Sequence, residues 1–197
     1  MNIITKNEVT AVILAGGMGR RMGGQDKGLV LFKDRPLIQH VIDAISQQMD
    51  NIIINANRNI ETYASLGYPV IEDSLEDFQG PLAGFYAAMQ QVKTPYILTL
   101  PCDGPYVSGD YLQCMLDVLN QQTCEMVIAS DGERMQPVYA LIPVVLKDSL
   151  HQFLQQGDRK IDRWYQGHQF ALAQFDPASH LFTNINSIDD MQESLGT

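Results

Sequence analysis

Residues 9–17 read VTAVILAGG, an unbroken apolar run that ends in two glycines. A strand that is covered on both faces loses the alternation of apolar and polar residues, so this run predicts a buried strand. A glycine-rich loop at residues 16–27 follows it. Pro36 then opens a predicted helix whose apolar residues share one face, namely Leu37, Ile38, Val41, Ile42 and Ile45.

The rest of the chain alternates strands with helices. Further strands are predicted at residues 51–55, 69–71, 95–101, 125–130, 136–142, 169–173 and 181–185. Further helices are predicted near 60–65, at 82–92, at 108–119 with Ser108 as cap, from Pro143 to about Gln155, and after a cap at 187–190. Small residues in the 82–92 helix, including Gly84, would permit close packing. The pattern predicts an α/β fold, a mainly parallel sheet with helices on both faces.

The composition is that of an ordinary globular protein. The chain has 197 residues, 45% apolar and 18% charged, which suits one domain over residues 1–197. No apolar run is long enough to span a membrane, and the first residues lack the layout of a secretory signal. Three cysteines without a C-x-x-C pair argue against a disulfide framework or a zinc site. We therefore expect a soluble, cytoplasmic protein.

The charge is unevenly distributed. The net charge of −10 argues against a general nucleic-acid or anionic-membrane surface. Residues 20–35, however, hold five basic and two acidic residues, whereas the rest of the chain holds eight basic and 21 acidic residues. A positive window on an acidic protein suggests a site for a small anion such as phosphate. The alternative is chance clustering on a solvated loop.

Ligands of parallel α/β sheets bind beyond the carboxyl ends of the strands. Polar residues and glycines follow several predicted strands at that point. They are Gly16, Gly17, Asn55, Asp73, Asp103, Asn184 and Asn186. Their recurrence in separate segments is what a real site would produce.

The loop LAGGMGRRMGGQDK at residues 14–27 has the composition of an anion cradle. Glycines let backbone N–H groups turn towards a ligand, and Arg21 and Lys27 add positive charge. A flexible loop that needs positive φ angles is the structural alternative. The P-loop pattern is excluded because Gly28 follows Lys27, and the dinucleotide fingerprint is excluded because a long loop precedes the helix.

Three further polar groups are candidates. Asp103 lies between two prolines in PCDGP and is suited to holding Mg²⁺, although a turn-forming Asp is about equally expected from this segment alone. Asp73 would add a second carboxylate or accept hydrogen bonds from a base or sugar; a capped loop is the alternative. Asn184 and Asn186 would project from one face of a strand, unless they are turn residues before a helix.

These motifs, in this order, resemble those of the molybdenum cofactor guanylyltransferases. The resemblance rests on LAGG…RMGGQDK, ED…GPLAG, PCDGP and NIN, and it covers residues 9–191. It implies a three-layer, Rossmann-like nucleotidyltransferase fold. It also implies the Mg²⁺-dependent transfer of GMP from GTP to the terminal phosphate of molybdopterin, with release of pyrophosphate. GTP and molybdopterin would be the substrates, other cofactor-assembly proteins candidate partners, and the chain a monomer.

The resemblance also assigns roles by position. Residues 9–107 would form the nucleotide-binding half and residues 108–197 the acceptor-binding half. Leu14, Ala15 and Gly16 would line the guanine-binding loop, and Gly17 and Arg21 would form the phosphate cradle. Lys27 would contact the triphosphate, Asn55 and Asp73 would contact the nucleotide, and Asp103 would bind both Mg²⁺ and the nucleotide. Asn184 and Asn186 would lie on the pterin side.

Two positions bear on the details. Gly16 stands where related cytidylyltransferases have LAAG, which favours GTP over CTP. Gly104 departs from the family, which more often places Thr or Met there, and we expect a looser turn after Asp103. Rival functions are a transferase that uses CTP or a sugar-phosphate acceptor, and a non-catalytic carrier of nucleotide or pterin.

Overall fold

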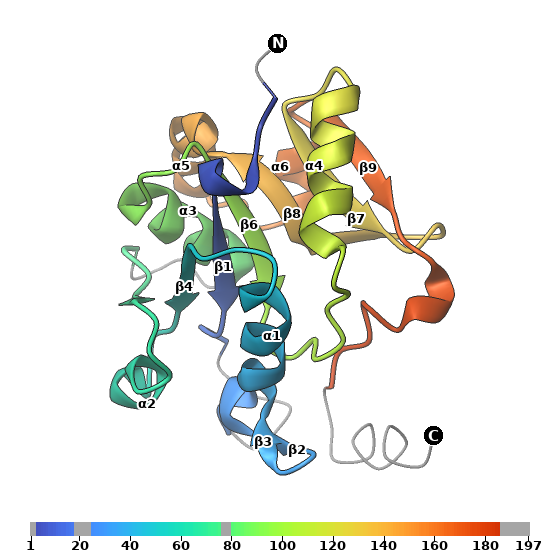
Figure 1. Ribbon diagram of the computed structural model, residues 1–197. Coiled ribbons are helices and arrows are strands. Elements are labelled where there is room, and N and C mark those ends of the chain that lie inside the picture. The colour runs from blue at the N-terminus through green and yellow to red at the C-terminus, as the bar shows by residue number, and fades with distance from the viewer. Residues whose placement is uncertain (1–2, 18–24, 76–79, 186–197) are drawn as a thin grey trace.

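The computed structural model describes residues 3–17, 25–75 and 80–185. Its main sheet has seven strands in the order β5-β4-β1-β6-β8-β7-β9 (Figure 1). Their bounds are β1 Val9–Leu14, β4 Ile52–Asn55, β5 Val70–Ile71, β6 Tyr96–Pro101, β7 Met126–Ser130, β8 Met135–Pro143 and β9 Phe170–Gln174. Only β8 runs against its neighbours. The predicted mainly parallel sheet is therefore confirmed.

Helices cover both faces of this sheet, as predicted. They are α1 Leu37–Ser46, α2 Ile60–Ala64, α3 Pro81–Gln91, α4 Tyr111–Gln121, α5 Lys147–Gln155 and α6 Ile161–Tyr165. The apolar residues of α1 and α4 join one core cluster, and those of α3, α5 and α6 join a second cluster on the other face (Figure 1). A separate hairpin of β2 Leu31–Phe32 and β3 Arg35–Pro36 precedes α1.

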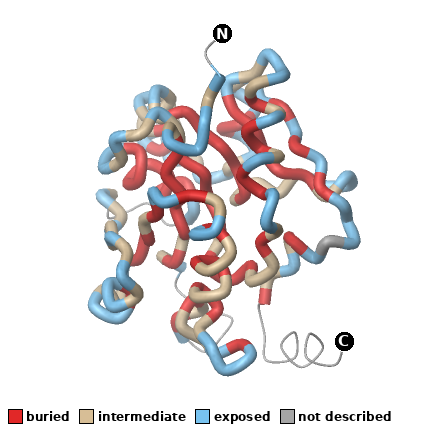
Figure 2. Tube along the Cα trace, viewed as in Figure 1, coloured by how far each residue is buried: buried red, intermediate tan, exposed pale blue. Residues whose placement is uncertain are grey.

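The central strand β1 owes its continuous apolar sequence to these two layers. Val9, Ala11 and Ile13 pack into the cluster under α1 and α4, whereas Val12 packs into the cluster under α3. All four side chains are fully buried, as the continuous buried trace in Figure 2 shows for the middle of the sheet. The strand predicted at residues 9–15 is thus confirmed.

Helix α1 follows the predicted pattern closely. Its buried residues are the five that the sequence places on one face, Leu37, Ile38, Val41, Ile42 and Ile45. The helix begins at Leu37, and Pro36 occupies the capping position before it. Burial of this apolar stripe against the sheet stabilises the helix more than its intrinsic propensity does.

Two predicted elements differ in the structure. Helix α4 begins at Tyr111 with Asp110 before it, so Ser108 is not its cap; the Ser108 carbonyl instead accepts the Tyr111 N–H at 3.2 Å. The helix predicted from Pro143 begins at Lys147 as α5, after the short 3₁₀ helix Val144–Leu146. Pro143 itself ends β8, because its strand pairing with β6 continues to that residue.

The strand predicted at residues 181–185 is wrong. The segment adds to no sheet; it turns through a bond from the Thr183 N–H to the His180 carbonyl. Its apolar residues are buried by packing instead, with Ile185 against Phe32 and Leu37. The apolar residues of this segment therefore contact different clusters, because Leu181 and Phe182 pack with the cluster that contains residues of α1 and α4. The final helix predicted after residue 187 lies outside the described residues.

Within residues 3–17, 25–75 and 80–185, no helix is both long and apolar enough to cross a bilayer.

Gly84 lies where α3 approaches the ends of β1 and β4. A Cβ there would lie 2.4 Å from Asn55 Oδ1 and 2.7 Å from Leu14 Cδ2. We expect Gly84→Ala to lower the free energy of unfolding by about 1–3 kcal/mol, because overpacking outweighs a gain of about 1 kcal/mol in helix propensity. Denaturant titration would measure the change. The control is Gly109→Ala, whose Cβ would meet no atom within 4 Å. Unchanged stability of Gly84→Ala would contradict the close packing.

Candidate functional site

The carboxyl ends of three parallel strands meet at one edge of the sheet. Leu14 at the end of β1 is in register with Asn55 on β4 and with Pro101 on β6. Backbone bonds extend this pairing past the strands: the Ala15 N–H donates to the Asn55 carbonyl at 2.7 Å, and the Cys102 N–H donates to the Leu14 carbonyl at 3.1 Å. The pairing thus draws the glycine loop, Asn55 and the Asp103 turn to the same edge.

Lys27 and Asp103 form an ion pair at this edge. The Lys27 ammonium lies 3.0 Å from Asp103 Oδ2, although 76 residues separate the two in sequence. The side chains are 25% and 13% exposed, so both are sheltered yet reachable from solvent. Such a pair offers an anion-binding cation and a cation-binding carboxylate within one contact distance. The sequence predicted a phosphate-binding lysine and a metal-binding carboxylate, and the fold places these two side chains in contact.

The backbone around Asp103 is held from two sides. Cys102 bonds to the end of β1, and the Asp103 carbonyl accepts the Ile185 N–H at 2.9 Å. The Cys102 side chain is buried, and burial, followed by the nearby charges of Asp103 and Asp26, raises the pKa of its thiol. Cys102 is therefore a neutral, small apolar residue under the turn, as its sequence context suggested.

Asp26, next to Lys27, anchors the end of the glycine loop. Its carboxylate is 8% exposed and accepts hydrogen bonds from the Tyr63 hydroxyl at 2.5 Å and from Asn59 Nδ2 at 2.9 Å. Burial, the neighbouring Cys102 and the bond to Asp26 raise the pKa of Tyr63, so its hydroxyl stays a donor. Sequence analysis missed this network; an acidic residue beside a candidate phosphate-binding lysine was its only local signal.

Arg58 ties the two described ends of the glycine loop together. Its Nη2 donates to the Gly17 carbonyl at 3.2 Å and to the Gln25 carbonyl at 2.9 Å. Its Nε also lies 3.4 Å from Asp26 Oδ2. Arg58 follows β4 in the segment NANRN, so the second strand helps to fix the loop after the first. Sequence analysis did not single out this arginine. Arg21, predicted to lie in the phosphate cradle, falls outside the described residues.

A second polar group gathers around Asp73. Asn55 Nδ2 donates to Asp73 Oδ1 at 2.9 Å, and Asn57 Nδ2 donates to Asp73 Oδ2 at 2.7 Å. The Asp73 N–H in turn donates to Asn57 Oδ1 at 2.8 Å. A Cβ on Gly16 would lie 2.9 Å from Asn57 Nδ2. Three predicted residues, Gly16, Asn55 and Asp73, therefore lie together, and Asn57 is a member that the sequence analysis missed.

Asn184, predicted to lie on the acceptor side, lies against the Asp103 turn. Asn184 Oδ1 is 3.3 Å from the position that a Cβ on Gly104 would occupy. Asn186 lies outside the described residues, so the predicted pairing of the two amides stays a prediction. Gly104 is buried, and the Tyr139 hydroxyl lies 2.1 Å from the position that a Cβ would occupy. The expected looser turn after Asp103 stays a prediction.

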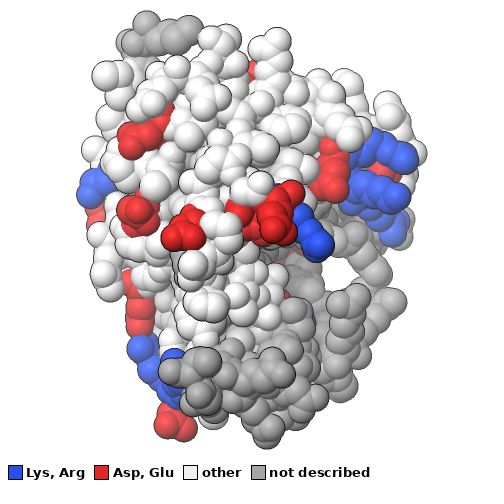
Figure 3. All heavy atoms as spheres, turned by 90° about the vertical axis from the view of Figure 1, so that its right-hand side faces the viewer, with Lys and Arg blue, Asp and Glu red and all other residues white. Residues whose placement is uncertain are grey.

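The positive window of residues 20–35 divides in the structure. Lys27 points to the strand ends, whereas Arg35 pairs with Asp43 of α1 and Lys33 lies 5.2 Å from the centre of the Phe32 ring. The charges of Arg35 and Lys33 are thus engaged by side chains of α1 and of the β2–β3 hairpin. On the face seen in Figure 3, acidic side chains are scattered, and basic side chains gather mainly near its margins.

Acidic ligands are sparse at the strand ends. Among the described residues, no group of three or more His, Cys, Asp or Glu side chains is arranged to hold a metal ion. Asp103 is the carboxylate that the Lys27 ammonium contacts. Mg²⁺ nevertheless binds commonly to one or two carboxylates and completes its shell with water and phosphate oxygens. The donor set at Asp103 therefore fits a magnesium ion that arrives with a phosphorylated substrate.

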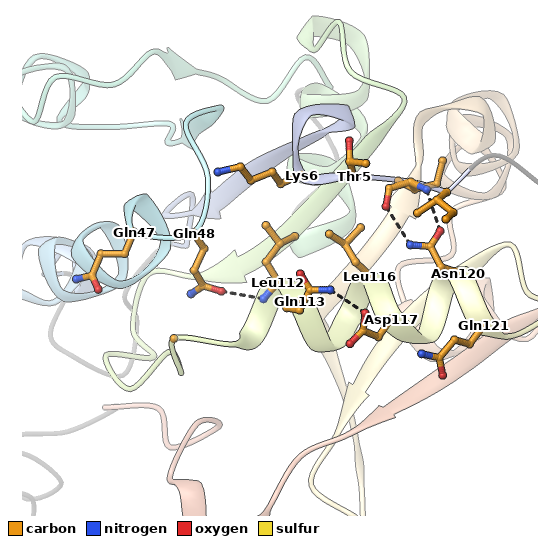
Figure 4. Close-up of a pocket in the computed structure, with 13 residues that line it drawn as sticks. Thr5, Lys6, Gln47, Gln48, Leu112, Gln113, Leu116, Asp117, Asn120 and Gln121 are labelled. Atoms are coloured by element: carbon orange, nitrogen blue, oxygen red, sulfur yellow. Dashed lines mark hydrogen bonds between the residues drawn. The ribbon is translucent and has the colours of Figure 1, made fainter.

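A hollow of about 700 Å³ lies elsewhere on the protein (Figure 4). It is bounded by the residues before β1, the end of α1 and one side of α4. Gln48 accepts the Leu112 N–H there, and Asn120 exchanges two hydrogen bonds with the backbone of Ile4. The hollow lies near the amino end of β1 and includes none of the predicted site residues.

Known proteins resemble the chain over nearly its whole length. Residues 11–172 match the family described as MobA-like NTP transferase domain. The molybdenum cofactor guanylyltransferase of Shewanella loihica is 46% identical over 186 residues, covering 94% of this chain and 95% of the relative. That of Shewanella putrefaciens is 47% identical over 185 residues, with coverage of 94% and 95%.

The fold has a counterpart in a crystal structure. Molybdopterin-guanine dinucleotide biosynthesis protein A from Archaeoglobus fulgidus superposes with a TM-score of 0.77 at 24% sequence identity. The superposition covers 94% of this chain and 96% of that chain. At this identity the likeness establishes the shared three-layer architecture.

Proposed function

The chain belongs to the MobA-like NTP transferase family, and from this membership we propose that it transfers GMP from GTP to the terminal phosphate of molybdopterin. The products are molybdopterin guanine dinucleotide and pyrophosphate. The observation that carries the proposal to the residues is the Lys27–Asp103 contact at the ends of the β1 and β6 strands. It offers, in one place, the two charges that a nucleoside triphosphate and its divalent ion require.

The base would lie beside Gly16, Asn55 and Asp73. Guanine presents both donors and acceptors along its edge, which asparagine amides can match. Asp73 already orients the two amides of Asn55 and Asn57, so their remaining polar atoms need little rearrangement. Leu14 and Ala15 would contribute the backbone of the same pocket, and Gly16 leaves room for close approach of the ring.

The triphosphate would lie along the glycine loop. Gly17 and Gln25 mark the described ends of that loop, and Arg58 joins their carbonyls. Lys27 would bind a phosphate oxygen as a point charge. Arg21 would add a second cation, by resemblance to the family. These charges favour binding of a polyanion to an otherwise acidic protein.

Mg²⁺ would be held by Asp103. When bound, the ion would neutralise charge on the phosphates and on the leaving pyrophosphate. The carboxylate of Asp103 is held in place by its turn and by the Lys27 ammonium. Lys27 and Asp103 would therefore act together, one on the phosphates directly and the other through the ion.

The reaction needs no general base from the protein. A phosphate monoester has a second pKa of about 6 and is largely ionised at neutral pH. An oxygen of the molybdopterin phosphate would attack the α-phosphorus of GTP while the bond to pyrophosphate breaks. The protein's work is to align two polyanions and offset their repulsion. Asn184, beside the Asp103 turn, would help to position the acceptor.

The direct test is product formation from purified components. With GTP, Mg²⁺ and molybdopterin, we expect pyrophosphate and molybdopterin guanine dinucleotide in equal amounts. Replacement of GTP by CTP should give little product, because the donors and acceptors of cytosine differ from those of guanine. Product that forms with CTP but not with GTP would indicate a cytidylyltransferase. Binding of both GTP and molybdopterin without release of pyrophosphate would indicate a carrier.

Lys27→Ala tests the triphosphate site. Loss of a charge-assisted bond to phosphate should weaken GTP binding by about ten- to a hundredfold. Calorimetric titration would measure the affinity. Lys33→Ala is the matched control, because it removes a lysine from the nearby hairpin that contacts the Phe32 ring. Equal GTP affinity of Lys27→Ala and wild type would refute the assigned role.

Asp103→Ala tests the metal site. We expect Mg²⁺-dependent turnover to fall by about a hundredfold or more, because charge stabilisation at the reacting phosphate is lost. The fold should remain intact by circular dichroism. Asp117→Ala, on the exposed side of α4 where it accepts a bond from Gln113, serves as control. Full activity of Asp103→Ala over a Mg²⁺ titration would remove the metal assignment.

A further inference from the structure

The strand β8 brings a tyrosine into direct contact with the Asp103 turn. A Cβ on Gly104 would lie 2.1 Å from the Tyr139 hydroxyl oxygen and 3.4 Å from its Cζ atom. The hydroxyl therefore fills the space that a side chain at position 104 would need. From this contact we propose that Tyr139 is a positioning residue that locks the acceptor-side segment 181–185 against the Asp103 turn.

Tyr139 cannot easily move out of this position. It is 2% exposed, and its ring makes edge contacts with Tyr111 and Phe182 at centroid distances of 6.1 and 5.1 Å. Its hydroxyl donates to the Leu181 carbonyl across 3.4 Å. Burial, followed by the charge of Asp103, raises the pKa of Tyr139, so the hydroxyl remains a neutral donor. Interlocked aromatic rings in a core resist displacement.

Tyr139 contacts both the Asp103 turn and the segment 181–185. On one side its hydroxyl touches Gly104; on the other, its ring and hydroxyl contact Phe182 and Leu181. A hydrogen bond from the Ile185 N–H to the Asp103 carbonyl joins the segment directly to the turn. Asn184 is thereby held within contact distance of Gly104, 3.3 Å from its Cβ position.

This tie matters because the segment belongs to no sheet. A strand is placed by its ladder of hydrogen bonds, whereas residues 181–185 leave β9 and approach the β2–β3 hairpin as irregular chain (Figure 1). Their position relative to Asp103 depends on core packing and a few contacts, and Tyr139 is the side chain that contacts both the segment and the turn. Since Asn184 is the proposed acceptor-side residue, this inference rests on the proposed function for its catalytic consequence.

The reciprocal pair Gly104→Ala and Tyr139→Phe provides the test. Gly104→Ala drives a methyl group into the Tyr139 hydroxyl, so we expect kcat/KM for molybdopterin to fall by about tenfold. Tyr139→Phe removes that oxygen and leaves the ring at 3.4 Å, so Gly104→Ala/Tyr139→Phe should regain activity to within about threefold of Tyr139→Phe alone. GTP affinity without metal should stay within about twofold in all three proteins. Gly109→Ala is the steric control.

Hydrogen exchange gives a readout that does not depend on activity. The Ile185 amide donates to Asp103, so its exchange should quicken about tenfold in Gly104→Ala and return towards wild type in the double variant. If Gly104→Ala does not fold, Tyr139→Leu, which empties the space without adding atoms, should quicken the same amide.

The possible failures are distinguishable. Additive losses in the double variant, or unchanged Ile185 exchange in both Gly104→Ala and Tyr139→Leu, would overturn the lock. A wild-type protein that makes no dinucleotide product, with the Ile185 exchange pattern as expected, would refute the proposed function and leave the lock standing.

Discussion

The parallel pairing of β1 with β4 and β6 is the constraint from which the rest of the site follows. It places Leu14, Asn55 and Pro101 in one register, so the residues after each strand emerge at one edge. The pairing is possible because β1 is apolar on both faces and two helical layers cover it. Asp103 follows β6 closely, and Lys27, at the far end of the glycine loop after β1, contacts it at this edge.

Polar networks then convert that edge into a shaped surface. Asp26, which is buried beside Lys27, accepts hydrogen bonds from Tyr63 and Asn59. Arg58 donates hydrogen bonds to both described ends of the glycine loop. Asp73 orders the amides after β4 in the same way. A buried carboxylate such as that of Asp26 is costly unless it is paired, so its network also stabilises the end of the glycine loop in one arrangement. Hydrogen bonds within the protein thus hold the described residues around Asp26 and Asp73 in place.

The second half of the chain reaches the same edge by different means. Strand β8 lies next to β6 and carries Tyr139 to the Asp103 turn, and residues 181–185 arrive without strand pairing. Core packing and a few hydrogen bonds, rather than strand pairing, hold this last segment in position. The same contact gives a physical reason for glycine at position 104, because the absence of a side chain leaves room for the Tyr139 hydroxyl from β8.

The amino-acid sequence by itself determined the α/β class, the buried β1, the apolar face of α1 and the polar residues that follow the strands. These depend on periodicity and on local backbone preferences, which are legible along the chain. The Asp26 network, the Arg58 bridge, the irregular course of residues 181–185 and the Tyr139–Gly104 contact were decided only by the tertiary structure. Each joins side chains that no local pattern links, and each exists because strand pairing and core packing bring distant segments into contact.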